Sequence, residues 1–423
     1  MGAANISALA EGSSNNLSIS GGVASFGSDL ANNIGVGDVI QFDSDGNSSV
    51  DEVVFIHRRY SSASFEVRLK DGAIPPDLVL DNDWEIFRAY TSINSFILGQ
   101  ENSGIDNGVS DFDTWTSGKN LVTSNEELNF TLYADNVEDL GGDGMFNSFI
   151  TGSTNELNIF APYKYEHVGI SQRHMGKWDE RYYTLNLTAS FSNLFVSGYT
   201  NISGLQIKTP GGLDQVKFIV VTNAEEVYVD SNIITGSTDL GNSSAITIDP
   251  SQVDYAQVYV TNNIAFDISD DNSGHCFGAY SYNLPTLKAY FYNNTAINCQ
   301  AGFFIGDSGG NANFFMENNL AINSVENDYT GSSLLVESSA NISSDATSPN
   351  SSFRNKTVEF LDYNNNDFRL SSTDIEAKNT GTNLTGKVRS FDLMGHSRLT
   401  DSGWDIGAHE ASTNLFRSVG QGS

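Results

Sequence analysis

Four segments in the second half of the chain share one pattern: a strand-like apolar run, a polar pair that ends in Asn, and a second apolar run. The Asn residues are Asn232, Asn263, Asn294 and Asn319, so successive copies lie 31, 31 and 25 residues apart. Gly204 takes the Asn position in an earlier copy, 28 residues before Asn232. A unit of this length cannot bury an apolar face alone, and it does so by stacking on its neighbours.

A stacked coil explains why the Asn recurs. Strands of neighbouring turns lie about 4.8 Å apart, so equivalent side chains come to lie above one another. Asn accepts the left-handed backbone of a sharp corner at little cost, and its amide can bond to the Asn of the next turn. The repeat therefore predicts an all-β fold, a right-handed parallel β-helix with about three strands per turn. The side chains expected in its core are Val229, Ile233, Val260, Ile264, Phe291, Ile297, Phe315 and Leu320.

Two other β architectures fit this spacing less well. An antiparallel sandwich gives no reason for an Asn corner to recur in register, and a propeller blade needs about 40–45 residues.

The repeat also divides the chain. Regular turns are expected over residues 201–345, after a small N-terminal β domain or cap over 1–95. Residues 96–200 are expected to form a connecting region with irregular first turns and a projecting loop, and 346–423 a C-terminal cap and tail.

The charge of the chain excludes some partners. It carries 21 Lys and Arg against 52 Asp and Glu, a net charge of −31. Such a polyanion repels nucleic acid and anionic membranes, and no apolar run is long enough for a membrane-spanning helix. The first residues lack the basic start and apolar stretch of a secretory signal. We therefore expect either a signal removed before residue 1 or release by another route, such as phage lysis.

The chain has two cysteines, Cys276 and Cys299. When the repeats are aligned by their glycines, Cys276 falls beside Phe304 and Cys299 beside Ile268. This alignment predicts two free thiols packed in the core.

The C-terminal region carries a motif series. It reads Asp367-Phe-Arg-Leu370, then Asp392-Leu-Met-Gly395-His-Ser-Arg398, then Asp405-Ile-Gly-Ala-His-Glu410. Over about 45 residues this series resembles the end of surface and viral β-helix proteins of the choice-of-anchor Q type, within the pectin-lyase-like superfamily. It departs from that family at Ser372–Gly381, where an S-P-A-I-D-x-G motif is usual. The resemblance implies a β-helix exposed on a cell or virion surface.

Two further expectations concern the ends of the coil. Asp405 and Glu410 flank Gly407, which suggests a tight turn that caps the last turn of the coil, because an open turn is an aggregation-prone edge. Residues 35–90, with 172–179, resemble the N-terminal part of β-helix proteins common in marine and phage-derived sequences.

An acidic stretch in the N-terminal domain is a candidate metal site. Asp43, Asp45, Asn47 and Asp51 offer oxygen ligands at alternate positions, as a Ca²⁺ loop requires. The stretch departs from the EF-hand, because Gly46 stands at position 4 and the Glu at position 12 is missing. A polar hairpin turn explains the same residues without an ion.

Two stretches resemble catalytic motifs. Asp270 and Asp271, with Gly274 and His275, resemble the acids and Gly-His-Gly of polygalacturonases, but all lie in one loop and Cys276 replaces the last Gly. A solvated turn is the better interpretation. The string Asp307–Gly310 resembles a serine-protease motif, and we interpret it as a loop of small residues. No catalytic residue is assigned.

A set of aromatic and imidazole side chains is a candidate surface for glycans or partner proteins. Exposed aromatic rings near Asn and Asp stack on sugars; the same rings also suit loop packing or a subunit interface. Tyr165, His174, Trp178 and Tyr182 are the principal candidates, with Tyr163 and Tyr183 beside them.

The sequence favours a non-enzymatic structural or adhesive protein exposed on a virion, as a capsid decoration, tail fibre or spike. We expect contacts with other virion proteins or copies of itself, so that a homo-oligomer is plausible, and contacts with host-surface glycans. No cofactor is required, although Ca²⁺ is a candidate. A secreted polysaccharide lyase or glycoside hydrolase and a bacterial cell-surface protein are the alternatives, since fold does not decide function.

Overall fold

The computed structural model describes residues 6–236, 241, 243–249, 256–269, 274–281, 287–307, 313–332, 338–399 and 403–411. The chain forms two compact units. The first comprises Met1–His174, Asp179–Asn186 and Gly198–Leu205, and the second Met175–Trp178, Leu187–Ser197 and Gln206–Ser423. No helix in the described ranges has the length and apolar character needed to cross a membrane.

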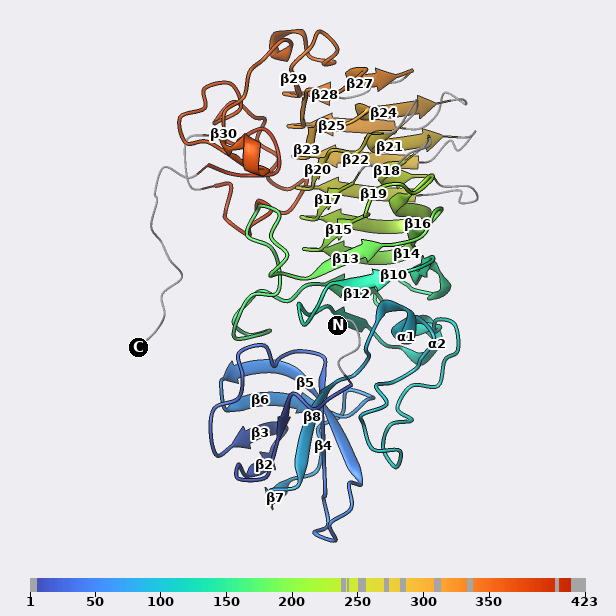
Figure 1. The fold of residues 1–423 in the computed structure, drawn as a ribbon, viewed down its shortest axis with the longest axis vertical. Helices are drawn as coiled ribbons and strands as arrows, with labels where there is room; N and C mark the ends of the chain where they lie inside the picture. The colour runs from blue at the N-terminus through green and yellow to red at the C-terminus, as the bar shows by residue number, and fades with distance from the viewer. Residues whose placement is uncertain are drawn as a thin grey trace. The chain divides into compact units, whose positions relative to one another are not determined.

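The first unit begins with an antiparallel sheet of eight strands in the order β1-β8-β4-β5-β6-β3-β2-β7, drawn in blue in Figure 1. Its alternating apolar side chains form a core of their own around Phe65 and Trp84. The predicted N-terminal β domain is therefore confirmed. Its strands are β1 (Ala10–Glu11), β2 (Leu17–Ser20), β3 (Val23–Phe26), β4 (Asp38–Phe42), β5 (Glu52–Ser61), β6 (Ser64–Arg68), β7 (Leu78–Asp81) and β8 (Trp84–Arg88).

Irregular structure follows the sheet in the same unit. Two short helices, α1 (Ile93–Ile97) and α2 (Leu121–Ser124), precede the first coiled strands. A capping box of Ser92 and Ser95 starts α1. The pairing of β9 (Leu128–Thr131) with β12 (Leu157–Phe160) is parallel and in register. The remaining elements are β10 (Glu138–Leu140), β11 (Gly144–Met145), η1 (Phe146–Ser148), β13 (Thr184–Leu187) and β14 (Asn193–Ser203).

Arg88 joins the N-terminal sheet to these strands. Its Nη1 lies 2.6 Å from Asp38 Oδ1, and its Nε lies 2.8 Å from Asp135 Oδ2. Its guanidinium carbon also lies 3.5 Å from the centre of the Tyr133 ring. The buried cation thus has both carboxylate and aromatic partners, which burial of a charge requires.

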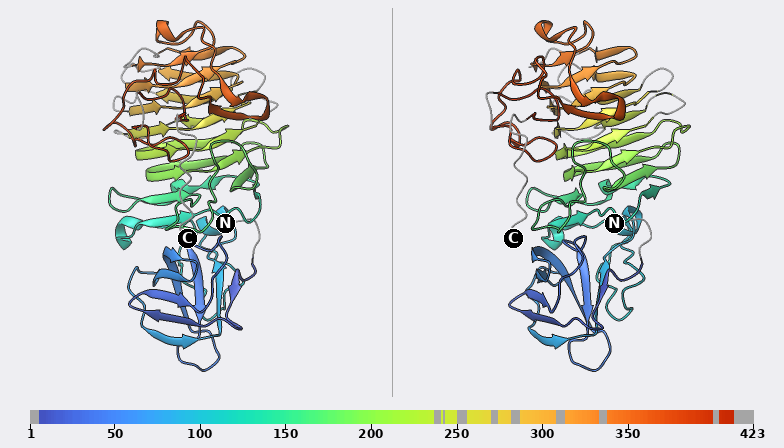
Figure 2. Two further views of the ribbon diagram at one scale, coloured as in Figure 1. Left: turned by 90° about the vertical axis from the view of Figure 1, so that its left-hand side faces the viewer. Right: turned by 60° about the vertical axis from the view of Figure 1, so that its left-hand side comes forward.

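The second unit is a coil of parallel strands, three to a turn (Figures 1 and 2). The predicted β-helix is confirmed as a β-solenoid. Its strands are β15 (Gln206–Lys208), β16 (Lys217–Asp230), β17 (Ile233–Thr235), β18 (Ser244–Ile248), β19 (Ala256–Thr261), β20 (Ile264–Phe266), β21 (His275–Ser281), β22 (Leu287–Tyr292), β23 (Thr295–Ile297), β24 (Ala301–Asp307), β25 (Asn313–Glu317), β26 (Leu320–Ile322), β27 (Asn327–Gly331), β28 (Ser338–Ser339) and β29 (Ile342–Ser343). After it come η2 (Ser351–Phe353), β30 (Phe360–Asp362), η3 (Tyr363–Asn365) and β31 (Asp367–Leu370).

The repeated Asn residues form the predicted ladder inside the coil. The side-chain amide of Asn232 donates to Asn263 Oδ1 at 3.0 Å, that of Asn263 to Asn294 Oδ1 at 3.1 Å, and that of Asn294 to Asn319 Oδ1 at 3.1 Å. The ladder continues through Asn341. Each of these side chains is fully buried, so the ladder satisfies amides that have no access to water.

The two members of the polar pair have different tasks. The first member takes the left-handed corner, at Ser231, Asn262, Asn293 and Asn318. The second member forms the ladder. Gly204, with φ of 76°, has the conformation of the corner residue.

One core prediction is wrong. Met316, and not Phe315, continues the inward row that runs from Val260 through Phe291. Phe315 points outward and stacks at 4.7 Å on Tyr290, within an external aromatic ladder. The other seven predicted core residues are buried.

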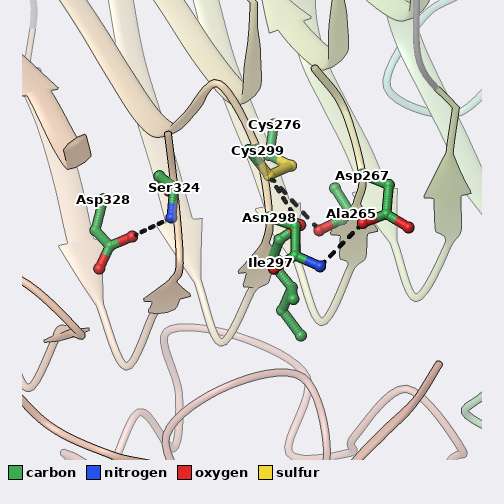
Figure 3. Close-up of a disulfide and its surroundings, with 8 residues drawn as sticks. All are labelled: Ala265, Asp267, Cys276, Ile297, Asn298, Cys299, Ser324 and Asp328. Atoms are coloured by element: carbon green, nitrogen blue, oxygen red, sulfur yellow. Dashed lines mark hydrogen bonds between the residues drawn. A yellow bond between two sulfur atoms is a disulfide. The ribbon is translucent and has the colours of Figure 1, made fainter. Parts of the chain in front are cut away.

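The prediction of two free thiols is also wrong. Cys276 and Cys299 form a disulfide with a Cα–Cα distance of 5.8 Å, shown in Figure 3. The strand register places Phe304 beside Gly278, so the alignment by glycines was displaced by two residues. Both cysteines are fully buried, as expected. The bond links β21 to a residue that lies two positions before β24, and these two strands are paired in adjacent turns.

The C-terminal motif residues hold their own segment together. Arg398 is buried and pairs with Glu410 at 3.0 Å. Asp392 accepts the Glu410 backbone N–H at 3.0 Å, and Asp405 accepts that of Ala411 at 2.6 Å. The acids and the arginine of the motif series are therefore structural.

This segment lies beside the corners of inner turns and does not close the last one. Arg398 donates to Asn262 Oδ1 at 3.0 Å, and the Ala408 N–H donates to Thr295 Oγ1 at 2.9 Å. The last turn is followed instead by Asn350, whose side-chain oxygen accepts the final ladder bond from Asn341 at 3.0 Å. The expectation that Asp405 and Glu410 cap the last turn is thus incorrect.

We expect Asn263→Ala to lower the free energy of unfolding by about 3–5 kcal/mol, because it leaves several buried groups of Asn232 and Val229 without partners. Guanidinium unfolding followed by circular dichroism measures the change. Asn365→Ala, at an exposed position, is the control and should change it by less than about 0.5 kcal/mol. A loss below about 1 kcal/mol for Asn263→Ala would contradict a stabilising ladder.

Replacing both cysteines with Ala should lower the free energy of unfolding by about 3 kcal/mol, because the disulfide closes a loop with a sequence separation of 23. Thiol titration of the denatured protein gives the direct test. No reactive thiol is expected before reduction and two per chain after it. Two reactive thiols in unreduced protein would show that the bond does not form.

Candidate functional site

A groove of about 590 Å³ opens on the second unit. Segments far apart in the sequence contribute to it, including the corners of four consecutive turns. Its walls are formed by Trp178, Lys208, Thr209, Pro210, Gly211, Thr235, Gly236, Asp267, Ser269, Asn298 and Val325.

The strand register explains why the polar residues of the groove lie together. Thr235, Phe266 and Ile297 are paired as the last residues of β17, β20 and β23. The next residues therefore form a second stacked corner, in which Asp267 and Asn298 have φ of 55° and 53°. Asx side chains suit this left-handed position.

Hydrogen bonds fix the side chains of this corner. The amide of Asn298 donates to Asp267 Oδ1 at 3.0 Å, as Figure 3 shows. The Tyr363 hydroxyl donates to Asn298 Oδ1 at 2.6 Å. The corner thus presents a carboxylate and an amide that are already oriented.

Trp178 supplies the aromatic wall. Its ring is half-buried and meets the Phe266 ring edge to face, with 6.4 Å between centroids. Within the described ranges its indole N–H has no hydrogen-bond partner. Lys208 adds a cation to the same groove. An aromatic ring beside a carboxylate, an amide and an ammonium group is suited to stacking on a sugar and bonding its hydroxyls.

The aromatic residues predicted from the sequence differ in exposure. In the first unit, Tyr165 is 58% exposed, whereas His174 is 2% exposed and thus not available for contact. Tyr182 is half-buried. Tyr183 is buried, and its hydroxyl donates to Glu138 at 2.8 Å. Trp178 belongs to the second unit, where it lines the groove.

The predicted metal-binding stretch forms the loop between β4 and β5. One carboxylate oxygen from each of Asp43, Asp45 and Asp51 lies within 4.8 Å of the others. Asn47 is beside them, where its side-chain oxygen accepts the Ser49 N–H at 2.8 Å. The sequence prediction therefore placed these acids together correctly.

Backbone groups already occupy much of this loop. Asp43 accepts the N–H groups of Gly46 and Ser48 at 2.8 and 2.6 Å. Burial acts to raise the pKa of Asp43, but these N–H groups, with those of Asp45 and Asn47, outweigh it and lower the pKa. These bonds are those of a polar hairpin loop, and an ion would share the carboxylates with them.

The described residues do not bring the candidate catalytic side chains together. Asp270, Asp271 and residues 308–310 lie outside the described residues. His275 is 1% exposed and stacks on Phe304 at 5.6 Å. Among the described residues that line the groove, Asp267 is the sole carboxylate.

Sequence reasoning found Trp178 but missed Lys208, Asp267 and Asn298. A signal for the last two was present, since Asp267 and Asn298 each follow a ladder Asn by four residues, as does Asn323. Lys208 carries a related signal, because it follows Gly204 of the earlier copy by four residues and pairs with Thr235 of the next turn.

Comparison with protein-family models, with curated proteins and with solved structures finds no match for this chain.

Proposed function

We propose that this protein is a non-enzymatic structural or adhesive component of a virion surface that binds glycans in the Trp178 groove. The groove carries the proposal: a half-buried aromatic ring lies beside oriented polar groups. Glycosidases usually need two carboxylates that flank the scissile bond, and the described part of the groove offers Asp267 alone.

Two further features support exposure outside a cell. A buried disulfide persists in oxidising surroundings and is rare in the cytosol. A net charge of −31 keeps such a protein soluble and disfavours nucleic acid and membranes as partners. Contacts with other virion proteins or with further copies of this chain belong to the same proposal. A bacterial cell-surface protein would share this physics, and immunogold labelling of purified virions distinguishes the two.

The binding experiment uses a glycan array and a panel of acidic and neutral polysaccharides. We expect the native chain to bind at least one glycan, and Trp178→Ala to weaken that binding by about tenfold, or about 1.4 kcal/mol. The loss follows from removal of the stacking surface. Trp178→Phe should retain part of the affinity.

Phe391→Ala is the matched control, because Phe391 is an aromatic residue of the second unit, 53% exposed, that does not line the groove. An equal loss in both variants would place the binding elsewhere. Reducing ends and unsaturated products are measured in the same samples. Robust turnover would replace the proposal with its alternative, a secreted polysaccharide lyase or hydrolase.

The proposal requires no cofactor, and we propose that Ca²⁺ binds weakly at the Asp43–Asp51 loop. Backbone N–H groups compete for Asp43, so we expect a dissociation constant of about 10⁻⁴–10⁻³ M, as in extracellular modules. Millimolar Ca²⁺ should raise the unfolding temperature measurably.

Asp45→Asn is the informative variant for this loop. Its side-chain oxygen can still accept the Asn47 N–H, a bond of 3.1 Å in the native loop, while one negative charge is removed. The Ca²⁺ response should then shrink. The proposal is wrong if Ca²⁺ raises the unfolding temperature of Asp45→Asn as much as that of the native chain, or if about 10 mM Ca²⁺ has no effect on the native chain. The loop is then a polar hairpin that binds no ion.

A further inference from the structure

The guanidinium of Arg59 is buried in the first unit without an acidic partner. Arg59 lies on β5 and is 3% exposed. Its Nε and Nη1 atoms are buried and make no hydrogen bond to any described residue. Both edges of the guanidinium fork therefore retain unused donors.

Two other buried arginines of the described residues, Arg88 and Arg398, pair with carboxylates. Arg88 is held by Asp38 and Asp135, and Arg398 pairs with Glu410 at 3.0 Å. Carboxylates are abundant, since the chain has 52 acidic residues. Burial of a charged group without a partner is costly, and Arg59 lacks the carboxylate that Arg88 and Arg398 each have.

Tyr165 and Gly169 lie next to the Arg59 guanidinium. The Tyr165 ring lies 4.7 Å from the guanidinium carbon and is 58% exposed. Its hydroxyl donates to the Tyr60 carbonyl oxygen at 3.3 Å, which is long for such a bond, so this bond holds the ring only weakly. A Cβ at Gly169 would lie 2.9 Å from Arg59 Nη2. The absence of a side chain there leaves room for the guanidinium.

Cations flank the two residues of this contact in the sequence. Arg58 precedes Arg59 and is exposed, and Lys164 precedes Tyr165. Glu166 is the nearby acid in sequence, and its backbone oxygen accepts the Arg59 N–H at 2.8 Å. No ion pair links its carboxylate to Arg59 among the described residues.

We propose that Arg59 and Tyr165 form a binding site for the carboxylate of an acidic sugar, distinct from the Trp178 groove. A carboxylate matches the planar donor fork of the guanidinium and supplies the charge that its burial lacks. The sugar ring that carries it stacks on the exposed Tyr165 ring once that ring turns aside. This site stands whether or not the groove binds glycans.

Thermal unfolding with sodium glucuronate as the probe tests the site. At about 20 mM, glucuronate should raise the unfolding temperature of the native chain by about 1–3 °C over sodium chloride of equal ionic strength. Glucose should have no effect. The increase should vanish in Arg59→Gln and persist in Arg58→Gln, which removes the same charge from the adjacent exposed residue.

A second variant covers the case in which Arg59→Gln does not fold. Tyr165→Trp changes an exposed residue and places an indole over Arg59, so glucuronate should change its fluorescence and glucose should not. Three outcomes overturn the proposal. They are no response of the native chain, an equal response in Arg59→Gln, or an equal response to acetate, which would indicate an anion site that does not recognise the sugar.

Discussion

The buried amide ladder is the interaction on which the solenoid depends. Each ladder Asn accepts a backbone N–H and a side-chain N–H from the turn before it, and donates to the turn after it and to a backbone oxygen. A buried corner would otherwise leave these backbone groups unpaired, and each unpaired group costs about 1–3 kcal/mol. Because every amide needs its neighbours, the ladder fixes the register of consecutive turns.

That register in turn positions the rest of the second unit. The left-handed residue before each ladder Asn turns the chain. After Asn263, Asn294 and Asn319 the short strand ends at a second corner formed by Asp or Asn. Asp267 and Asn298 lie together in the groove for this reason. Trp178 reaches the groove from a different segment, so the groove combines a repeating element with a non-repeating one.

The sequence was sufficient for features that depend on spacing. The parallel coil, the Asn ladder and the N-terminal sheet follow from periodic patterns. Features that need register accurate to one residue were missed. Phe315 and Met316 are both apolar, and a slip of one residue reverses the face of a strand. The disulfide was missed because an alignment of repeats compares equivalent positions, whereas Cys299 lies three residues before Gly302, the position opposite Cys276 in the strand register. The contact of Arg59 with Tyr165 joins segments far apart in the sequence, which periodicity does not report.

The ladder also has consequences for how such a chain can vary in length. Its Asn residues are 31, 31, 25 and 22 residues apart, yet the same bonds form at every step. The intervening loops can therefore lengthen or shorten without disturbing the axis. Asn350 ends the series only nine residues after Asn341. Its side-chain oxygen accepts the last bond of the ladder, and no further turn of the coil follows among the described residues. Duplication of one internal unit would then produce a longer solenoid that reuses existing surfaces, so the length of the coil could change through gene duplication alone.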